Sequence, residues 1–179
     1  SASTSYLAIE APVGREIRFG LRIALRDVDA LLDLDADRDG RLTWGEVEDR
    51  EQDILQLVRS AVALATADGG ACTPAFDVPH WQRIDAGSYL VLAGRAACAA
   101  RAERLQLTYR MFAGIDPSHR VLVRLPNSDR PAALAPGATL AFAVSGNADA
   151  ARDAPAQGFG AMFFDGALHI LSGLDHLLF

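Results

Sequence analysis

The chain has 179 residues, 50% of them hydrophobic, and carries a formal net charge of −6. This length is enough for one domain with its own core, and the hydrophobic content excludes disorder as the default expectation. The acidic balance, with no basic stripe along any expected element, argues against a nucleic-acid partner.

The chain begins with a short apolar run at 5–10 and a turn at 12–14. The first clear strand follows at 17–26, where apolar side chains alternate with an arginine-rich set at a period of two. Asp27 comes next and is expected to cap a short helix. This helix leads into the most informative segment of the sequence.

Residues 35–46 read Asp-Ala-Asp-Arg-Asp-Gly-Arg-Leu-Thr-Trp-Gly-Glu and match a twelve-residue calcium loop of the EF-hand type. Alternate side chains point inward when such a loop curls around one hard cation, and Gly40 stands where the chain must turn sharply. The expected ligands are three aspartates, one backbone carbonyl, a threonine and the closing glutamate: Asp35, Asp37, Asp39, Arg41, Thr43 and Glu46. The alternative is an acidic turn that caps the next helix without an ion. We favour calcium, because a cap needs one acidic residue and this loop has four.

The helix that leaves the loop is expected from Trp44 to Thr66, because apolar residues recur there at helical spacing until Asp68-Gly69-Gly70. Beyond it the pattern is that of strands. The expected strands are 78–84, 88–97, 104–112, 121–125 and 139–144. Several short strands separated by turns are typical of an antiparallel β-sandwich. The expected fold is therefore α+β: a β-sandwich domain over 1–146, with the helix–calcium loop–helix inserted at about 27–67.

The two cysteines, Cys72 and Cys98, do not form a metal-type Cys-x-x-Cys pair. They are either one disulfide or two unrelated buried thiols. We expect the disulfide, because a calcium site of this kind suits the extracytoplasmic side of a membrane, where the environment is oxidising.

The end of the chain differs from the rest. Residues 147–157 are rich in Ala, Asp and Pro and are expected to be a linker, whereas 158–179 are strongly apolar and contain no basic residue. We interpret 158–179 as the start of a first transmembrane helix that is cut off partway. The alternative is a C-terminal amphipathic helix of a soluble domain.

Ionisable residues interrupt this apolar segment. On a helix, Asp165, His169 and His176 share one face, and Asp175 lies at its edge. Such residues in a membrane span usually face a bundle interior or an ion path. Imidazoles with a carboxylate suit a transition metal such as nickel, cobalt or zinc, although a histidine pair can equally be structural.

The segment 169–176, His-Ile-Leu-Ser-Gly-Leu-Asp-His, resembles the first-helix motif of the HupE/UreJ family of membrane proteins, which is a His, then a Gly, then Asp-His. The family often has Pro after the first His, where this chain has Ile170. Other segments resemble the soluble region that precedes the membrane helices in one branch of the family. These segments are 24–29, 35–46, Tyr109 and 116–120.

The resemblance implies an integral membrane protein that handles nickel or cobalt, with His169, Asp175 and His176 as residues of the metal pathway. The region before the membrane would be extracytoplasmic, either periplasmic or at the cell surface. In this interpretation calcium is structural, because extracellular calcium fills even a weak site. The alternative is a secreted, calcium-stabilised binding or adhesion module.

A third possibility is a metallohydrolase that uses His169, His176 and an acid. The sequence has no nucleophile elbow, no His-Glu-x-x-His and no Gly-rich phosphate loop, so we do not expect an enzyme. Of the other histidines, His119 follows a turn and is expected to make structural hydrogen bonds. His80 lies in a weak strand, and we assign it no role.

Overall fold

The structure is a computed structural model of the whole chain, and it describes residues 3–84 and 87–144. By internal contacts the chain divides into the units Ser1–Gly146 and Asn147–Phe179. The expected linker and apolar helix, with His169, Asp175 and His176, lie outside the described residues.

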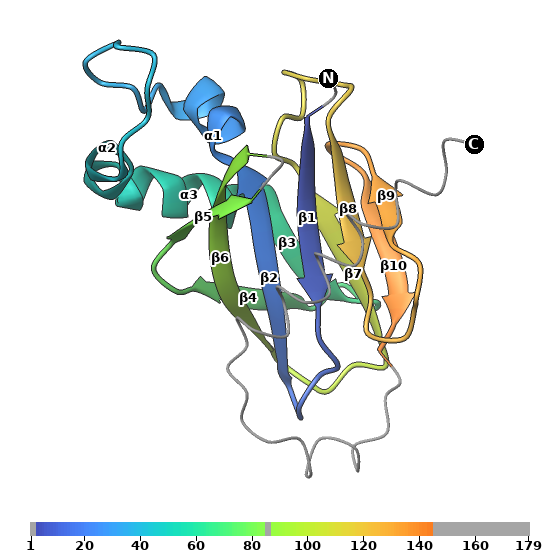
Figure 1. Cartoon of the computed structure of the whole chain (residues 1–179). Coiled ribbons are helices and arrows are strands. Elements are labelled where there is room, and N and C mark those ends of the chain that lie inside the picture. Colours follow the sequence, from blue (N-terminus) through green and yellow to red (C-terminus); the bar gives the residue numbers. More distant parts are fainter. Residues whose placement is uncertain (1–2, 85–86, 145–179) are drawn as a thin grey trace. The chain divides into compact units, whose positions relative to one another are not determined.

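Ten strands and three α-helices follow one another in the described part of the first unit (Figure 1). Their bounds are β1 Thr4–Ile9, β2 Glu16–Ala24, α1 Leu25–Leu32, α2 Trp44–Asp49, α3 Glu51–Ala61, β3 Val62–Thr66, β4 Ala71–Phe76, β5 His80–Ile84, β6 Gly87–Cys98, β7 Arg104–Tyr109, β8 Arg120–Arg124, β9 Ala132–Leu134 and β10 Thr139–Ala143.

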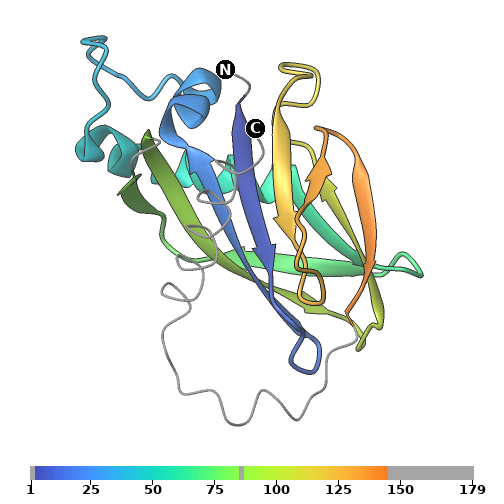
Figure 2. The same cartoon turned by 45° about the vertical axis from the view of Figure 1, so that its right-hand side comes forward.

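All ten strands belong to one sheet, in the order β10-β7-β3-β4-β6-β2-β1-β8-β9, with β5 paired to β6. Neighbouring strands are antiparallel except β1 and β8, which are parallel. The strands at the two ends, β9 and β10, are consecutive in the sequence and are joined by 135–138. The sheet therefore curls into a nearly closed, barrel-like layer (Figures 1 and 2).

The class of fold agrees with the α+β expectation, but the strands do not separate into the two sheets of a sandwich. The unexpected strand β4 pairs with both β3 and β6, and it thereby links the two halves of the sheet. At the other end, the unexpected β9 pairs with β8 and extends that edge. A long twisted sheet of this kind curls on itself and buries its inner face.

The core is built by the alternation seen in β2. Its apolar side chains Ile17, Phe19, Leu21 and Ile23 are at most 2% exposed. Each helix packs one face against the core, and the buried residues of α3 recur at helical spacing. These residues are Ile54, Leu55, Val58 and Ala61.

The arginine-rich side of β2 is not uniformly exposed. Arg18 is exposed, but Arg22 is 1% exposed, and its guanidinium lies 4.7 Å from the ring centroid of Tyr6 and 5.4 Å from that of Tyr89. The two tyrosines come from β1 and β6, the strands on either side of β2. Arg22 is thus packed between aromatic rings, an arrangement that an alternating sequence pattern does not reveal.

The helices differ from the expectation at three points. Asp27 is not a cap, because α1 already begins at Leu25 and Asp27 lies in its first turn. The helix after the loop is broken at Arg50 into α2 and α3. It also ends at Ala61 and not at Thr66, because Val62–Thr66 forms β3 with alternating burial and pairs with β7. The inserted helices therefore cover 25–61 and not 27–67.

The cysteines are joined, as expected. Cys72 lies in β4 directly opposite Cys98 in β6, and the two sulfur atoms form a disulfide with an S–S distance of 2.08 Å. No strand was expected around Cys72, and Pro74 in this segment cannot donate a hydrogen bond to a strand ladder. The structure places Pro74 within β4, opposite Ala96.

Candidate metal site

The loop 35–46 projects from one end of the sheet, between α1 and α2 (Figure 1). Its entry is fixed by Asp29, whose Oδ1 accepts hydrogen bonds from the backbone N–H groups of Leu34 (2.8 Å) and Asp35 (3.1 Å). Leu34 is 1% exposed, and Leu42 packs against the core from within the loop. Both ends of the loop are therefore attached to the domain by apolar contacts.

The three aspartates come together as the sequence predicts. Asp35, Asp37 and Asp39 each offer a carboxylate oxygen, and these oxygens lie within 4.8 Å of one another. The chain turns directly after them at Gly40, where φ is +78°, a value that L side chains rarely adopt. The Gly40 N–H donates to Asp35 Oδ2 at 2.8 Å. Carboxylate oxygens gathered in this way could bind a metal ion.

The second oxygen of Asp35 is the least satisfied atom of the cluster. Asp35 Oδ1 is buried and accepts no hydrogen bond from the described residues. By contrast, Asp37 Oδ1 accepts from the Asp39 N–H at 3.1 Å, and Asp39 Oδ1 accepts from the Arg41 N–H at 2.7 Å. A buried acceptor without a partner is costly, and a cation beside it would remove that cost.

Glu46 is not grouped with the aspartates. Its Oε2 accepts from the backbone N–H of Thr43 at 2.9 Å and from the Thr43 hydroxyl at 2.8 Å, and its Oε1 accepts from the Ala36 N–H at 2.9 Å. The Thr43 side chain in turn accepts from the Glu46 N–H, which completes a capping box at the start of α2. The expected alternative, a helix cap, is therefore present in the same loop as the acidic cluster.

These hydrogen bonds also keep Glu46 ionised. The backbone N–H of Thr43 lowers the pKa of Glu46, and the Thr43 hydroxyl lowers it further. The carboxylate is anchored at both ends of the loop, next to Ala36 and to Thr43. The charged carboxylate of Glu46, the last residue of the loop, therefore bonds to Ala36, the second residue.

Arg50 closes the base of the loop, a role that no local sequence pattern indicates. It ends α2, and its guanidinium donates to the carbonyl oxygens of Asp33 (3.3 Å) and Leu32 (3.0 Å) at the end of α1. The same group pairs with Asp53 at 2.6 Å. Carbonyl groups at a helix C-terminus carry partial negative charge, so Arg50 is well placed to hold α1 against α3.

The remaining candidates have different surroundings. His119 is 0% exposed and makes structural hydrogen bonds, as expected, with Ser3 and Tyr109. His80 is exposed on β5. The side chain of Arg41 lines a neighbouring pocket, while its backbone N–H donates to Asp39 Oδ1 within the loop.

No protein-family model and no curated protein sequence matches this chain. Within 3–84 and 87–144, no helix is both long enough and apolar enough to cross a membrane.

Proposed function

We propose that residues 35–46 bind a structural calcium ion, and that this chain is the extracytoplasmic calcium-binding region of a HupE/UreJ-like membrane protein. The observation that carries the calcium proposal is the convergence of the Asp35, Asp37 and Asp39 carboxylates around a buried Asp35 oxygen that has no partner. Oxygen ligands alone favour a hard cation over nickel or cobalt at this site.

The proposed role of calcium is to brace the helices. The loop connects α1 to α2, and Leu34 and Leu42 attach it to the core. The ion would offset the repulsion among three carboxylates, and Glu46 would supply the closing ligand after giving up hydrogen bonds to Thr43 and Ala36. Binding to the folded loop alone stabilises the fold by mass action.

The membrane part of the proposal has separate support. The Cys72–Cys98 disulfide is typical of an oxidising compartment, in agreement with an extracytoplasmic location. The resemblance of 169–176 to the HupE/UreJ first-helix motif supports a metal pathway through His169, Asp175 and His176, with nickel or cobalt as the transported ion. A fractionation experiment tests it: the full chain should partition into membranes, whereas a variant that ends at Gly146 should not.

The calcium proposal is tested by thermal unfolding. After removal of metal with EDTA, calcium at about 100 times its Kd should stabilise the protein by about 2.7 kcal/mol. Asp35→Asn should abolish most of this gain, because it removes a ligand charge. Asp129→Asn, at an exposed position outside the loop, is the matched control and should respond to calcium as the parent does. An unchanged melting temperature in calcium, or the same gain in Asp35→Asn, would overturn the proposal.

A further inference from the structure

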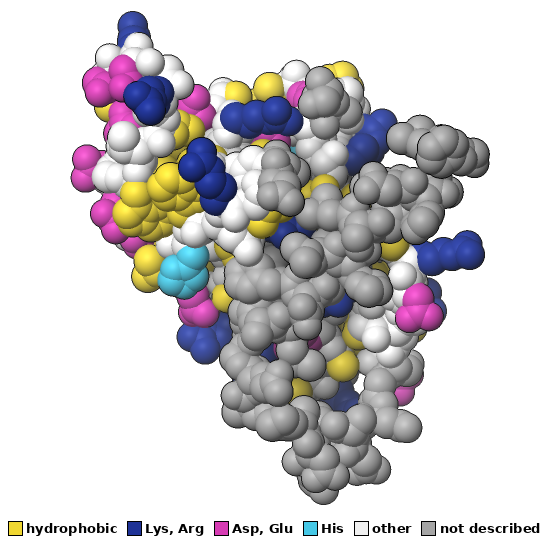
Figure 3. Space-filling model, in the orientation of Figure 1, with side chains coloured by type: hydrophobic (Ala, Val, Ile, Leu, Met, Phe, Trp, Pro, Cys, Tyr) yellow, Lys and Arg dark blue, Asp and Glu magenta, His cyan; other side chains and the backbone are white. Residues whose placement is uncertain are grey.

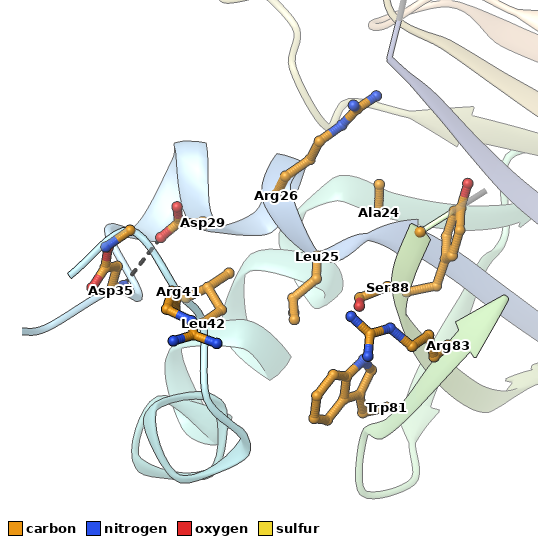
Figure 4. A pocket seen from close by; sticks show the side chains of 13 residues that line it. Ala24, Leu25, Arg26, Asp29, Asp35, Arg41, Leu42, Trp81, Arg83 and Ser88 are labelled. Carbon is orange, nitrogen blue, oxygen red and sulfur yellow. Dashed lines mark hydrogen bonds between the residues drawn. The ribbon is translucent and has the colours of Figure 1, made fainter. Parts of the chain in front are cut away.

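A pocket of 560 Å³ lies next to the loop, between the start of α1 and the β5–β6 hairpin (Figure 4). Its volume falls within the range of small-molecule sites, about 300–1,000 Å³. One wall consists of loop residues, among them Asp35, Arg41 and Leu42, and the opposite wall of Trp81 and Arg83. The pocket thus joins the candidate metal loop to a strand distant in the sequence.

Three arginines are among the residues that line this pocket, Arg26, Arg41 and Arg83. Arg41 and Arg83 lie on opposite sides of it, with Leu25 between them (Figure 4). In the part of the chain that the structure describes, neither Arg41 nor Arg83 forms an ion pair with a carboxylate. Arg26 is near Asp27, at 3.5 Å, and its side chain extends away from the pocket centre (Figure 4).

The two acidic residues of the lining make hydrogen bonds to the backbone of the loop. Asp29 accepts from two backbone N–H groups at the loop entry, and Asp35 accepts one from Gly40, while Asp35 Oδ1 has no partner among the described residues. In the described part of the chain neither carboxylate pairs with Arg41 or Arg83, so both guanidinium groups are available to an anion. Arginine recognises carboxylates through paired hydrogen bonds, so the pocket is suited to a carboxylate-bearing ligand.

The wall opposite the loop offers a flat hydrophobic contact. Trp81 is 41% exposed and stacks on Trp44 of α2, with ring centroids 6.3 Å apart and planes 17° apart. Figure 3 shows hydrophobic side chains gathered on this side of the molecule with basic groups beside them. A large exposed indole that packs against a second one offers a surface on which another ring can stack.

We propose that this pocket binds a small organic anion consisting of a carboxylate on a flat, aromatic body. Arg41 and Arg83 hold the carboxylate from opposite sides, and Trp81 stacks on the ring. Anion binding in the pocket is also coupled to the metal loop, because Asp35 is part of both sites. This coupling rests on the proposed calcium function: an ion that neutralises Asp35 removes a negative charge from the pocket wall and strengthens anion binding, by about fivefold.

The test is a calorimetric titration of the full chain with 2-naphthoate, in EDTA and in calcium. The matched ligand 2-naphthamide has the same ring without the charge, and it should bind far more weakly. Arg41→Gln and Arg83→Gln should each weaken naphthoate binding about tenfold. Arg41→Gln keeps the loop intact, because this position contributes only backbone groups. Trp81→Leu should weaken both ligands.

Arg59→Gln is the control variant, because Arg59 is exposed on α3 and does not line the pocket. It should bind naphthoate as the parent does. The proposal is overturned if naphthoate does not bind, if the amide binds equally well, or if the two pocket variants behave like Arg59→Gln. If calcium fails to stabilise the protein but naphthoate still binds in EDTA, the calcium function fails and the anion pocket stands. Equal naphthoate affinity in EDTA and in saturating calcium would overturn the coupling.

Discussion

Tyr109 and His119 stack with their ring planes 11° apart, and the Tyr109 hydroxyl lies 3.3 Å from His119 Nε2. The ring of Phe112 also stacks on His119, with ring centroids 4.2 Å apart. His119 Nδ1 lies 2.5 Å from Ser3 Oγ, which donates to Asp27 at 2.6 Å. This buried chain of contacts joins the end of β7 and the start of β8 to the N-terminal residues and α1.

The first prediction concerns pH. Burial lowers the pKa of His119 below its ordinary value of 6.5, so the imidazole is neutral in the folded protein at pH 7. A lowered folded-state pKa contributes stability that is fully present above the unfolded value and is lost as pH falls through the folded value. The free energy of unfolding should therefore fall below about pH 6.5, as measured by urea denaturation at a series of pH values.

His119→Gln should be less stable at pH 8 and should lose the part of this pH dependence that comes from the imidazole. His80→Gln is the control, because His80 is exposed, and its pH dependence should match that of the parent. If His119→Gln and the parent lose stability in parallel between pH 7 and pH 5, the prediction is wrong.

The second prediction concerns the capping box. Thr43→Ala removes the hydroxyl that accepts from the Glu46 N–H and donates to its carboxylate. We expect a loss of about 1 kcal/mol in the free energy of unfolding of the metal-free protein. Thr43→Ser keeps a hydroxyl and should recover most of the loss. Equal stabilities of the alanine variant and the parent in urea titrations would contradict the role of this cap.

The third prediction concerns Gly94 in β6. A Cβ at this position would lie 2.6 Å from both Cε2 and Cζ of Phe19 and 3.2 Å from Phe76 Cδ1. Because Phe19 is fully buried and stacks edge-on against Phe76, it has little room to move. Gly94→Ala should cost roughly 1–3 kcal/mol of stability.

Gly45 provides the opposite case. It lies inside α2, and a Cβ there would meet no atom within 4 Å. Gly45→Ala should stabilise the protein by about 0.5–1 kcal/mol, because alanine loses less backbone entropy in a helix. Chemical denaturation of both variants compares the two effects directly, and a harmless Gly94→Ala would mean that Phe19 can move after all.

The fourth prediction concerns the disulfide, which joins residues 26 positions apart. Closing a loop of this length reduces the entropy of the unfolded chain and is expected to stabilise the fold by about 3 kcal/mol. Reduction should lower the denaturation midpoint of the parent accordingly. A Cys72→Ser, Cys98→Ser double variant should start at the lower midpoint and should not respond to reductant. A parent midpoint that is the same before and after verified reduction would exclude a stabilising bond.

The acidic cluster of residues 35–46 could be predicted in detail because the information for it is local. The alternating aspartates and Gly40 fix the turn within a few residues, and the structure brings Asp35, Asp37 and Asp39 together as expected. Glu46 was expected to be the closing ligand, with a helix cap as the alternative use of the loop. In the structure it serves the capping box with Thr43.

Features that depend on distant partners were predicted poorly. Val62–Thr66 continues a helical pattern when the sequence is considered alone, but it becomes a strand because β7 and β4 pair on its two sides. Pro74 made a strand at 71–76 unexpected. Without β4, the sequence did not indicate that the strands form a single continuous sheet. The arginine pocket was missed for the same reason, because Trp81 and Arg83 reach the loop only through the pairing of β5 with β6.

The incomplete closure of the sheet at β9 and β10 has a consequence for how copies of this protein meet. A terminal strand normally offers a row of free backbone groups on which another chain can grow. In the described part of the chain, β9 and β10 do not pair with each other, and the link 135–138 donates two backbone N–H groups within the fold, from Gly137 to Tyr109 and from Ala138 to Ala135. The outer edges of β9 and β10 are therefore the places where a strand of a neighbouring molecule would add to this sheet.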